Sequence, residues 1–212
     1  MKNTSKTKKE SMAGKIFFRI IAAVIALTVI PSAIFLPLFK IVLKASFLDY
    51  GLGEEISISE LSDFITQDDL KGILEFFSGE KEIGAQAKPI VAPVVCFLIF
   101  FALSLIMSIV IFFFAALSNM KKTIFFESLG GIALVIAAMA SFTKASNLIV
   151  SGTVSLINLF GDGILTKLLN FFINVDTLKM GSAMFIMMTS FICLAAWVGA
   201  YLMTEIGENK KG

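Results

Sequence analysis

Hydrophobic and polar positions alternate along this chain in long blocks. Extended apolar runs lie within residues 16–43, 90–117, 124–142 and 180–204, and charged segments separate them. A helix needs about 20 apolar residues, or roughly 30 Å of length, to cross the hydrocarbon core of a bilayer. The pattern therefore predicts four transmembrane helices, one in each range.

The first run carries the features of both a membrane anchor and a signal peptide. It contains Pro31 and Pro37, which should kink a helix, and it is closed by Lys40 and Lys44, whose charges can reach the interface. Its apolar core is longer than the 7–15 residues of a signal peptide, and no small-x-small cleavage site follows it. We therefore expect this first span to stay in the protein.

Between the first two spans, residues 45–88 form an acidic outer loop. Residues 61–65 and 66–79 show helical spacing of apolar side chains, and Thr66-x-x-Asp69 resembles a capping box. These signals predict two short amphipathic helices, too small to bury a core of their own. Residues 1–15 read as a flexible basic tail, and residues 205–212 as a short polar tail.

Residues 143–179 carry a polar stripe. Six polar side chains recur there every three or four residues: Lys144, Asn147, Ser151, Ser155, Asn158 and Asp162. On one helix they would fall within an arc of about 80°. After the Gly161-Asp162-Gly163 turn, the apolar spacing over 164–175 predicts a second amphipathic helix in the interface.

Three arrangements fit this polar stripe. Residues 145–161 could lie flat on the outer leaflet with the stripe toward water. They could instead extend the third span as one long helix whose stripe contacts another subunit. In the third arrangement they enter the bilayer and the stripe lines a polar path. A fifth full span would move the C-terminal lysines outside, and no Gly or Pro between Gly131 and Gly152 would turn the chain.

Small residues recur at helical spacing in two of the predicted spans. They allow the backbones of membrane helices to approach closely. These candidate packing positions are Gly130, Ala133, Ala137 and Ser141 in the third span and Ala195 and Gly199 in the fourth.

Composition supports the membrane assignment. Hydrophobic residues make up 57% of the 212 residues, charged residues only 16%, and the mean hydropathy is +0.90. These values exclude a disordered chain, a nucleic-acid-binding module and an ordinary soluble enzyme. Ten lysines and arginines lie in the N-terminal segment, the 118–123 turn and the C-terminus, whereas acidic residues exceed basic ones by four on the opposite side. The positive-inside rule therefore predicts that both termini are cytoplasmic.

Residues with catalytic chemistry are scarce. The chain has no histidine, so no Ser-His or Cys-His nucleophile pair can be built. Cys96 and Cys193 each lie inside an apolar run, where we expect small buried side chains rather than a disulfide. The adjacent acid pairs Glu54-Glu55 and Asp68-Asp69 lie in the outer loop, where solvated charge is the expected role. We predict no catalytic residue, metal site or cofactor.

The sequence thus predicts an all-α integral membrane protein of the cell membrane, with four transmembrane helices and short amphipathic helices in the two outer loops. Four spans with a larger first outer loop resemble the plan of claudin-like and tetraspanin-like proteins, but their loop cysteine and tryptophan motifs are missing. We expect a non-catalytic subunit or accessory protein that contacts copies of itself or other membrane subunits. The alternative is a channel or small-solute transporter subunit lined by the polar stripe.

Overall fold

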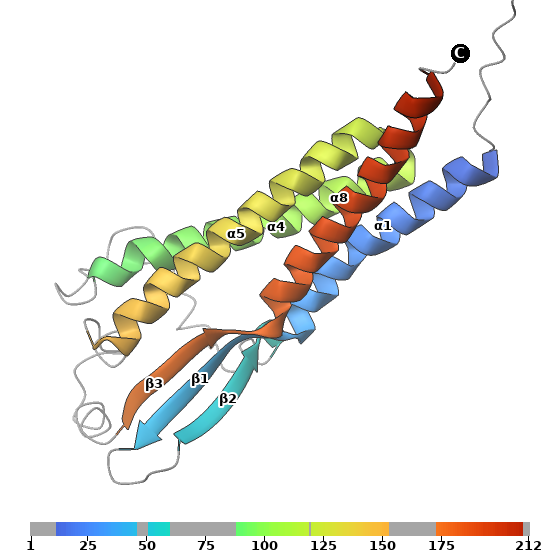
Figure 1. Ribbon diagram of the computed structural model, residues 1–212. Coiled ribbons are helices and arrows are strands. Elements are labelled where there is room, and N and C mark those ends of the chain that lie inside the picture. The colour runs from blue at the N-terminus through green and yellow to red at the C-terminus, as the bar shows by residue number, and fades with distance from the viewer. Residues whose placement is uncertain (1–11, 46–50, 60–87, 119, 153–172, 210–212) are drawn as a thin grey trace, which may run out of the picture.

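The computed structural model describes residues 12–45, 51–59, 88–118, 120–152 and 173–209, and its largest part is a four-helix bundle (Figure 1). The helices are α1 (Met12–Phe35), α4 (Lys88–Leu117), α5 (Lys121–Val150) and α8 (Ser182–Asn209). Each helix packs against two others, in the cyclic order α1, α4, α5, α8. Successive helices run in opposite directions, so the bundle has up-down-up-down topology.

All four helices are long and apolar enough to cross a membrane, as the sequence predicts. The qualifying segments are Gly14–Phe35, Lys88–Leu117, Lys121–Val150 and Ser182–Ile206. The bundle has two distinct ends. At the end called here the basic end, α1 begins, α4 turns into α5 and α8 finishes. At the opposite end, called the sheet end, three strands extend the helices (Figure 1).

The three strands correct the prediction of an all-α fold. They are β1 (Pro37–Ala45), β2 (Gly51–Ser57) and β3 (Ile173–Met180), and they form an antiparallel sheet in the order β2-β1-β3. The central strand pairs Leu43 with Leu52 of β2 on one side and Ile41 with Leu178 of β3 on the other. The segment that follows α1 and the segment that precedes α8 therefore meet in one sheet, which the local sequence pattern does not reveal.

The first predicted span is also corrected, because the helix ends eight residues before residue 43. α1 stops at Phe35 and β1 starts at Pro37. Proline lacks an N–H donor and disfavours helical geometry in the residue before it, so the helix ends at this point. The segment beyond Pro37 contains the β-branched Ile41 and Val42, which fit a strand. Pro31, in contrast, lies within α1.

Other predicted boundaries also change. The third span was expected over 124–142, but α5 continues to Val150. Gly152, two residues after this end, has a φ of 71°, the left-handed conformation typical of a helix stop. The predicted amphipathic helix over 164–175 overlaps β3 from Ile173, so its last part is a strand. The short helices predicted over 61–65 and 66–79, and residues 153–172, lie outside the described part.

Gly181 joins the sheet to the bundle. Its N–H donates a 2.9 Å hydrogen bond to the Leu38 carbonyl, immediately before α8 begins. A Cβ at this position would overlap the backbone carbonyl of Pro37. Only glycine therefore lets the two chain segments approach this closely.

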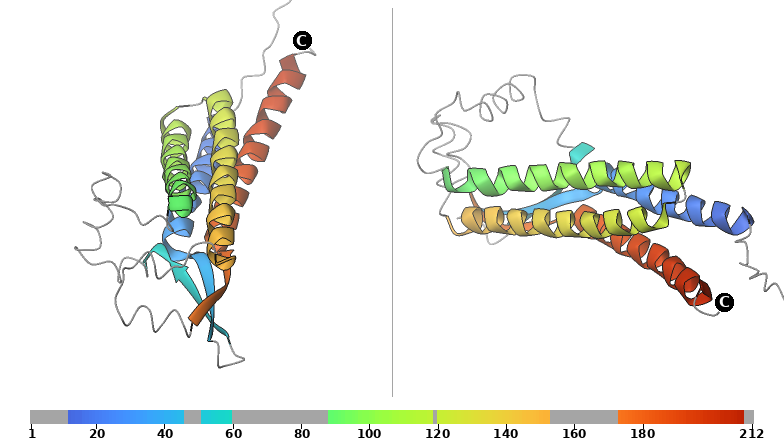
Figure 2. Two further views of the ribbon diagram at one scale, coloured as in Figure 1. Left: turned by 90° about the vertical axis from the view of Figure 1, so that its left-hand side faces the viewer. Right: turned by 90° about the horizontal axis from the view of Figure 1, so that it is seen from above.

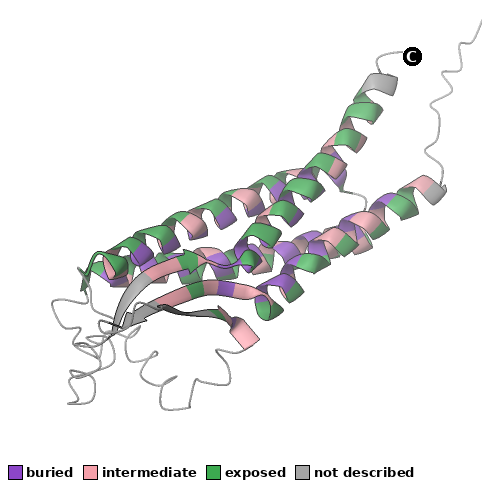
Figure 3. Ribbon diagram, turned by 60° about the horizontal axis from the view of Figure 1, so that its bottom comes forward, coloured by how far each residue is buried: buried purple, intermediate pink, exposed green. Residues whose placement is uncertain are grey.

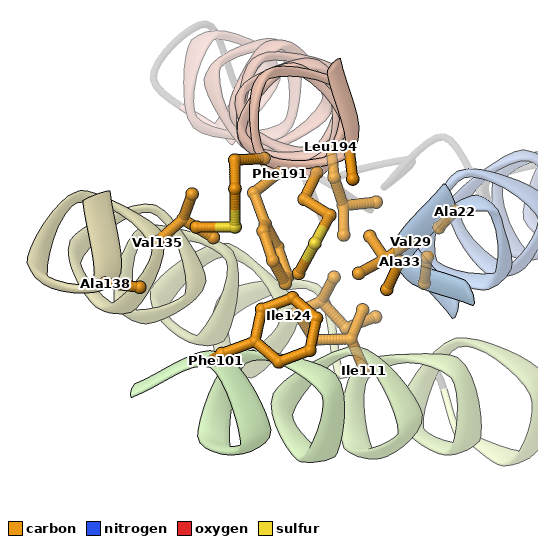
Figure 4. Packing of buried hydrophobic residues seen from close by; sticks show 14 of the residues in the cluster. Ala22, Val29, Ala33, Phe101, Ile111, Ile124, Val135, Ala138, Phe191 and Leu194 are labelled. Atoms are coloured by element: carbon orange, nitrogen blue, oxygen red, sulfur yellow. The ribbon is translucent and has the colours of Figure 1, made fainter. Parts of the chain in front are cut away.

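Apolar side chains from all four helices fill the centre of the bundle. Figure 3 shows that buried positions follow the inward faces of the helices, whereas exposed ones face outward. Phe191, only 1% exposed, lies near the middle of this core (Figure 4). The other buried residues labelled in Figure 4 are Ala22, Val29, Ala33, Phe101, Ile111, Ile124, Val135, Ala138 and Leu194.

A series of aromatic rings extends this core toward the sheet. The ring centroids of Phe97 and Phe101 of α4 are 5.8 Å apart, and Phe97 also lies 5.6 Å from Phe142 of α5. The Phe142 ring stacks against Phe39 of β1 at 6.5 Å. Phe142 of α5 thus connects β1 to the ring pair of α4.

Candidate functional site

At the basic end, Arg19 of α1 binds the end of α4. Its guanidinium donates a 3.0 Å hydrogen bond from Nε to the Ala115 carbonyl and a second bond to the Ala116 carbonyl. The last carbonyls of a helix have no partner within the helix and carry the negative end of its dipole. Arg19 therefore satisfies these acceptors from a neighbouring helix, a role that the sequence does not reveal.

Lys121, the first residue of α5, is almost completely buried at this end. Its side chain is 4% exposed, and its ammonium forms an ion pair with Glu205 of α8, which is 45% exposed. The ammonium also lies 5.4 Å from the ring centroid of Phe18 and 5.3 Å from that of Tyr201. Aromatic faces attract a cation. Lys121 thus links α1, α5 and α8 through one charged group.

Aromatic side chains continue this cluster between α1 and α8. The Trp197 ring lies 6.2 Å from Phe17 and 5.4 Å from Tyr201, and Tyr201 contacts Phe18 at 4.8 Å. The indole nitrogen of Trp197 is buried and has no hydrogen-bond partner within the described part of the chain. Trp197 and Tyr201 thus pack between α1 and α8.

Hydroxyl groups form hydrogen bonds that link neighbouring helices. Ser108 of α4 donates a 2.5 Å hydrogen bond to the Ala26 carbonyl of α1, and Thr28 Oγ1 lies 3.2 Å from Ser190 Oγ of α8. Such bonds hold membrane helices together. The sequence signal for them, a Ser or Thr within an apolar run, is present at all three positions, but it does not identify the partner.

The polar stripe is placed in part. Lys144 and Asn147 lie exposed on α5, and Ser151 is exposed at its C-terminal end. α5 runs without a break through 143–150, so this part of the stripe belongs to the third helix, as in the second of the three arrangements. Ser155, Asn158 and Asp162 lie outside the described residues. The neighbouring Ser146 is buried and donates a hydrogen bond to the Leu178 carbonyl of β3.

The candidate packing residues of α5 divide between two faces. A Cβ on Gly130 would lie 3.1 Å from the terminal methyl of Met107 in α4. Ala133 is exposed, and Ala137 and Ser141 are half-buried. The tightest helix approach on α5 is at Gly131, where a Cβ would lie 2.5 Å from the Phe191 ring of α8. Sequence analysis missed Gly131 because the predicted spacing starts from its neighbour.

The candidate packing residues of α8 both face the bundle. Ala195 is 7% exposed, and a Cβ on Gly199 would lie 3.1 Å from the Phe125 ring of α5.

The two cysteines do not share this environment. Cys96 and Cys193, expected to be buried, are exposed on the outer surface of α4 and α8. A thiol is weakly polar, so an outward apolar helix face accepts it as well as a core does.

Exposed side chains recur at regular intervals along the outward face of α5. Exposed positions follow each other at alternating steps of three and four residues from Lys122 to Val150. One set, spaced by seven, is Phe126, Ala133, Ala140 and Asn147; the set between them is Leu129, Ile136, Thr143 and Val150. Any helix with one exposed face gives this spacing, and the exposed positions of α4 from Ala92 to Ile106 show it too, so the two faces differ only in their side chains. The outward face of α4 consists mainly of large apolar side chains, as is typical of lipid contact: Leu98, Ile99, Leu103, Ile106, Ile109 and Phe113.

The part of the chain that the structure describes holds no group of three or more histidine, cysteine, aspartate or glutamate side chains that could bind a metal ion. No family model, no curated protein and no solved structure matches this chain. The surfaces and contacts described above are therefore the basis for a function.

Proposed function

We propose that this protein is a non-catalytic, multi-pass subunit of a membrane complex that assembles through its transmembrane helices, in the first place with further copies of itself. The outward face of α5 supports this proposal most directly. There, Ala133 and Ala140 leave space for a neighbouring helix, while Leu129 and Ile136 supply large side chains beside that space. In lipid, helices associate through such close packing because apolar burial alone gives no advantage.

Asn147 adds a polar group to the same face, one heptad beyond Ala140. It lies near the exposed Lys144 at the sheet end of α5, where its amide can form a hydrogen bond to a partner helix. In helix pairs, a single asparagine at such a position also fixes the alignment of the two helices. Asn147 would therefore set the register of a second helix packed on this face.

The proposed orientation places the basic end in the cytoplasm and the sheet in the outer compartment of the cell membrane. The positive-inside rule supports it, and both ends of the described chain lie at the basic end. Impermeant maleimide applied to intact cells should label Ser78→Cys and not Ser5→Cys, in a background where Cys96 and Cys193 are alanine. Labelling of Ser5→Cys from outside would contradict this orientation.

Assembly is tested by energy transfer between two fluorescently tagged populations of the full chain in liposomes. Transfer should occur for the parent, and Ala133→Leu/Ala140→Leu should weaken self-association roughly tenfold, equivalent to about 1.4 kcal/mol. Ala102→Leu is the matched control, because Ala102 is an exposed alanine on the outer surface of α4. No transfer for the parent, or equal losses for both variants, would contradict the proposal.

The alternative of a pore or transporter subunit has less support. Phe101, Ile111, Phe191 and other large side chains fill the centre of the bundle. Lys144 and Asn147 are exposed on the outer surface rather than turned into this core. A polar path along the stripe would therefore run between subunits, and it would require the same assembly through α5.

A further inference from the structure

The three-stranded sheet has one face toward the bundle and one face away from it. Phe39 of β1 and Met180 of β3 are directly opposite each other in the register, and both pack against the buried core. Successive side chains of a strand point to opposite faces. The next pair in the register, Lys40 and Lys179, therefore lies on the face away from the bundle, called here the outer face, and both residues are exposed.

Glu55, Lys40 and Lys179 form one row across this outer face. Lys40 is directly opposite Glu55 of β2 on one side and Lys179 of β3 on the other. Directly opposite side chains of antiparallel strands have Cβ atoms only about 4.5–5.5 Å apart. Glu55 pairs with the Lys40 ammonium at 2.9 Å, whereas Lys179 has no ion-pair partner among the residues that the structure describes. The row therefore carries one negative and two positive charges.

The two lysines repel each other unless an anion lies between them. Like charges directly opposite each other destabilise a sheet. An oxyanion between two ammonium groups offsets this repulsion and accepts a charge-assisted hydrogen bond from each of them. Thr177 lies two residues before Lys179, so its hydroxyl is on the same face and adds a third donor. Two cations and a hydroxyl on one face suit a phosphate group, which has several acceptor oxygens.

We propose that Lys40, Thr177 and Lys179 bind a phosphate group, carried either by the headgroup of an anionic phospholipid or by inorganic phosphate. Lys40 follows the end of α1 by five residues, and Lys179 precedes α8 by three. At about 3.3 Å per strand residue, both lie within roughly 17 Å of the ends of these helices along the chain. They are therefore close to the level of lipid headgroups. The lipid source rests on the membrane insertion in the proposed function, whereas binding of inorganic phosphate does not.

Two measurements on the full chain in dodecyl maltoside micelles, which contain no phosphate, distinguish the two sources. Native mass spectrometry compares the binding of phosphatidylglycerol with that of phosphatidylcholine, and broadening of the phosphorus NMR resonance reports binding of inorganic phosphate. A preference for phosphatidylglycerol of roughly two- to fivefold at low salt assigns the site to a lipid headgroup. Binding of inorganic phosphate without such a preference assigns it to free phosphate. Absence of both overturns the proposal.

Two double variants locate the site. Lys40→Gln/Lys179→Gln should weaken whichever binding is observed roughly tenfold, because it removes both cations. Lys88→Gln/Lys144→Gln is the matched control, because it removes the same charge from exposed positions at the sheet end. Lys144 lies about 200° around α5 from Ser146, which bonds β3, so it faces away from the sheet. Equal losses in the two double variants would overturn the proposal.

Two single variants test the other members of the outer face. Glu55→Gln should strengthen binding roughly two- to threefold, because the carboxylate beside Lys40 repels phosphate. Thr177→Val keeps the branched shape and removes the hydroxyl, so it should weaken binding roughly two- to threefold. Weaker binding in Glu55→Gln would overturn the site, and unchanged binding in Thr177→Val would overturn the role of the third donor.

The midpoint temperature of unfolding gives an independent readout. Lys179→Gln removes the repulsion with Lys40, so it should raise the midpoint of the chain without phosphate. The same variant should gain less than the parent from an excess of the phosphate ligand that binds, because it binds that ligand more weakly. A lowered midpoint without ligand, or the full gain with ligand, would overturn the proposal.

These outcomes separate the phosphate site from the proposed function. Absence of phosphate binding together with normal energy transfer between copies would contradict only this inference. Normal phosphate binding without energy transfer would contradict only the assembly.

Discussion

The two ends of the bundle are held together by different means. At the sheet end, β1 continues α1 after a single residue, and β3 leads into α8 through Gly181, so backbone pairing ties the first helix to the last. At the basic end, a few long side chains make the links: Arg19 to the end of α4, and Lys121 to Glu205 and two rings. Many weak backbone bonds thus hold one end, and a small number of charged groups holds the other.

Because the two ends are held differently, different kinds of substitution should destabilise them. A backbone joint tolerates changes of side chain but not an added atom where two backbones meet. A side-chain link fails when one partner is removed, even though the backbone can stay in place. Figure 2 shows that α8 inclines away from α5 toward its C-terminal end, so the Lys121–Glu205 pair connects the two helices where they begin to separate.

The largest expected effect is at the backbone joint. Gly181→Ala places a Cβ against the Pro37 carbonyl, so the Gly181–Leu38 hydrogen bond must shift or break. We expect the free energy of unfolding in detergent to fall by about 3 kcal/mol. Gly130→Ala is the control: its Cβ meets only the flexible end of Met107, and alanine favours a helix. Similar values for the two variants would show that the close backbone approach at Gly181 adds no special cost.

The second prediction compares two ion pairs of the same type. Breaking a buried pair costs about 3–5 kcal/mol, but Glu205 is partly exposed, so Glu205→Gln should cost only about 2 kcal/mol. In the sheet, Lys40 and Glu55 form a pair at 2.9 Å with side chains 46% and 53% exposed, and Glu55→Gln should cost less than about 1 kcal/mol. Urea or thermal unfolding of the purified variants measures both.

A third variant distinguishes lost charge pairing from damaged packing at this site. Adding Lys121→Met to Glu205→Gln removes the buried cation and keeps a side chain of similar volume. Such apolar replacements of buried pairs are often neutral or stabilising, so the double variant should be more stable than Glu205→Gln alone. A double variant less stable than the single one would show that the ammonium acts mainly through Phe18 and Tyr201.

The smallest expected effect concerns two buried serines of α5. Ser146→Ala removes the hydrogen bond to Leu178 and with it a link between the bundle and β3, which should cost about 1 kcal/mol. Ser128 bonds only the Ile124 carbonyl of its own helix, 2.6 Å away, so Ser128→Ala should change the stability by less than about 0.5 kcal/mol. Equal losses would show that the bond to the strand adds nothing beyond a local one.

The four spanning-length helices were predictable because charge-free apolar runs report directly on length and burial. The sheet was not, because β1 pairs with residues of β3 that are 128 to 141 positions away, and Lys40 and Lys44 look like the flanks of a helix in the local sequence. Arg19 and Lys121 lie at predicted helix ends. Whether such a charge faces solvent or a neighbouring helix depends on how all four helices pack together. The spacing of small residues in the third span pointed to Gly130, yet the neighbouring Gly131 meets Phe191.

The pairing of β1 between β2 and β3 also sets an order of events during synthesis. β2 follows β1 within a few residues, so this hairpin can form soon after Gly51–Ser57 has been made. The other edge of β1 stays open until Ile173–Met180 has been made, after α4 and α5. An open strand edge is a site for wrong pairing between chains. Completion of the sheet therefore marks the moment when the nascent chain no longer exposes the second edge of β1.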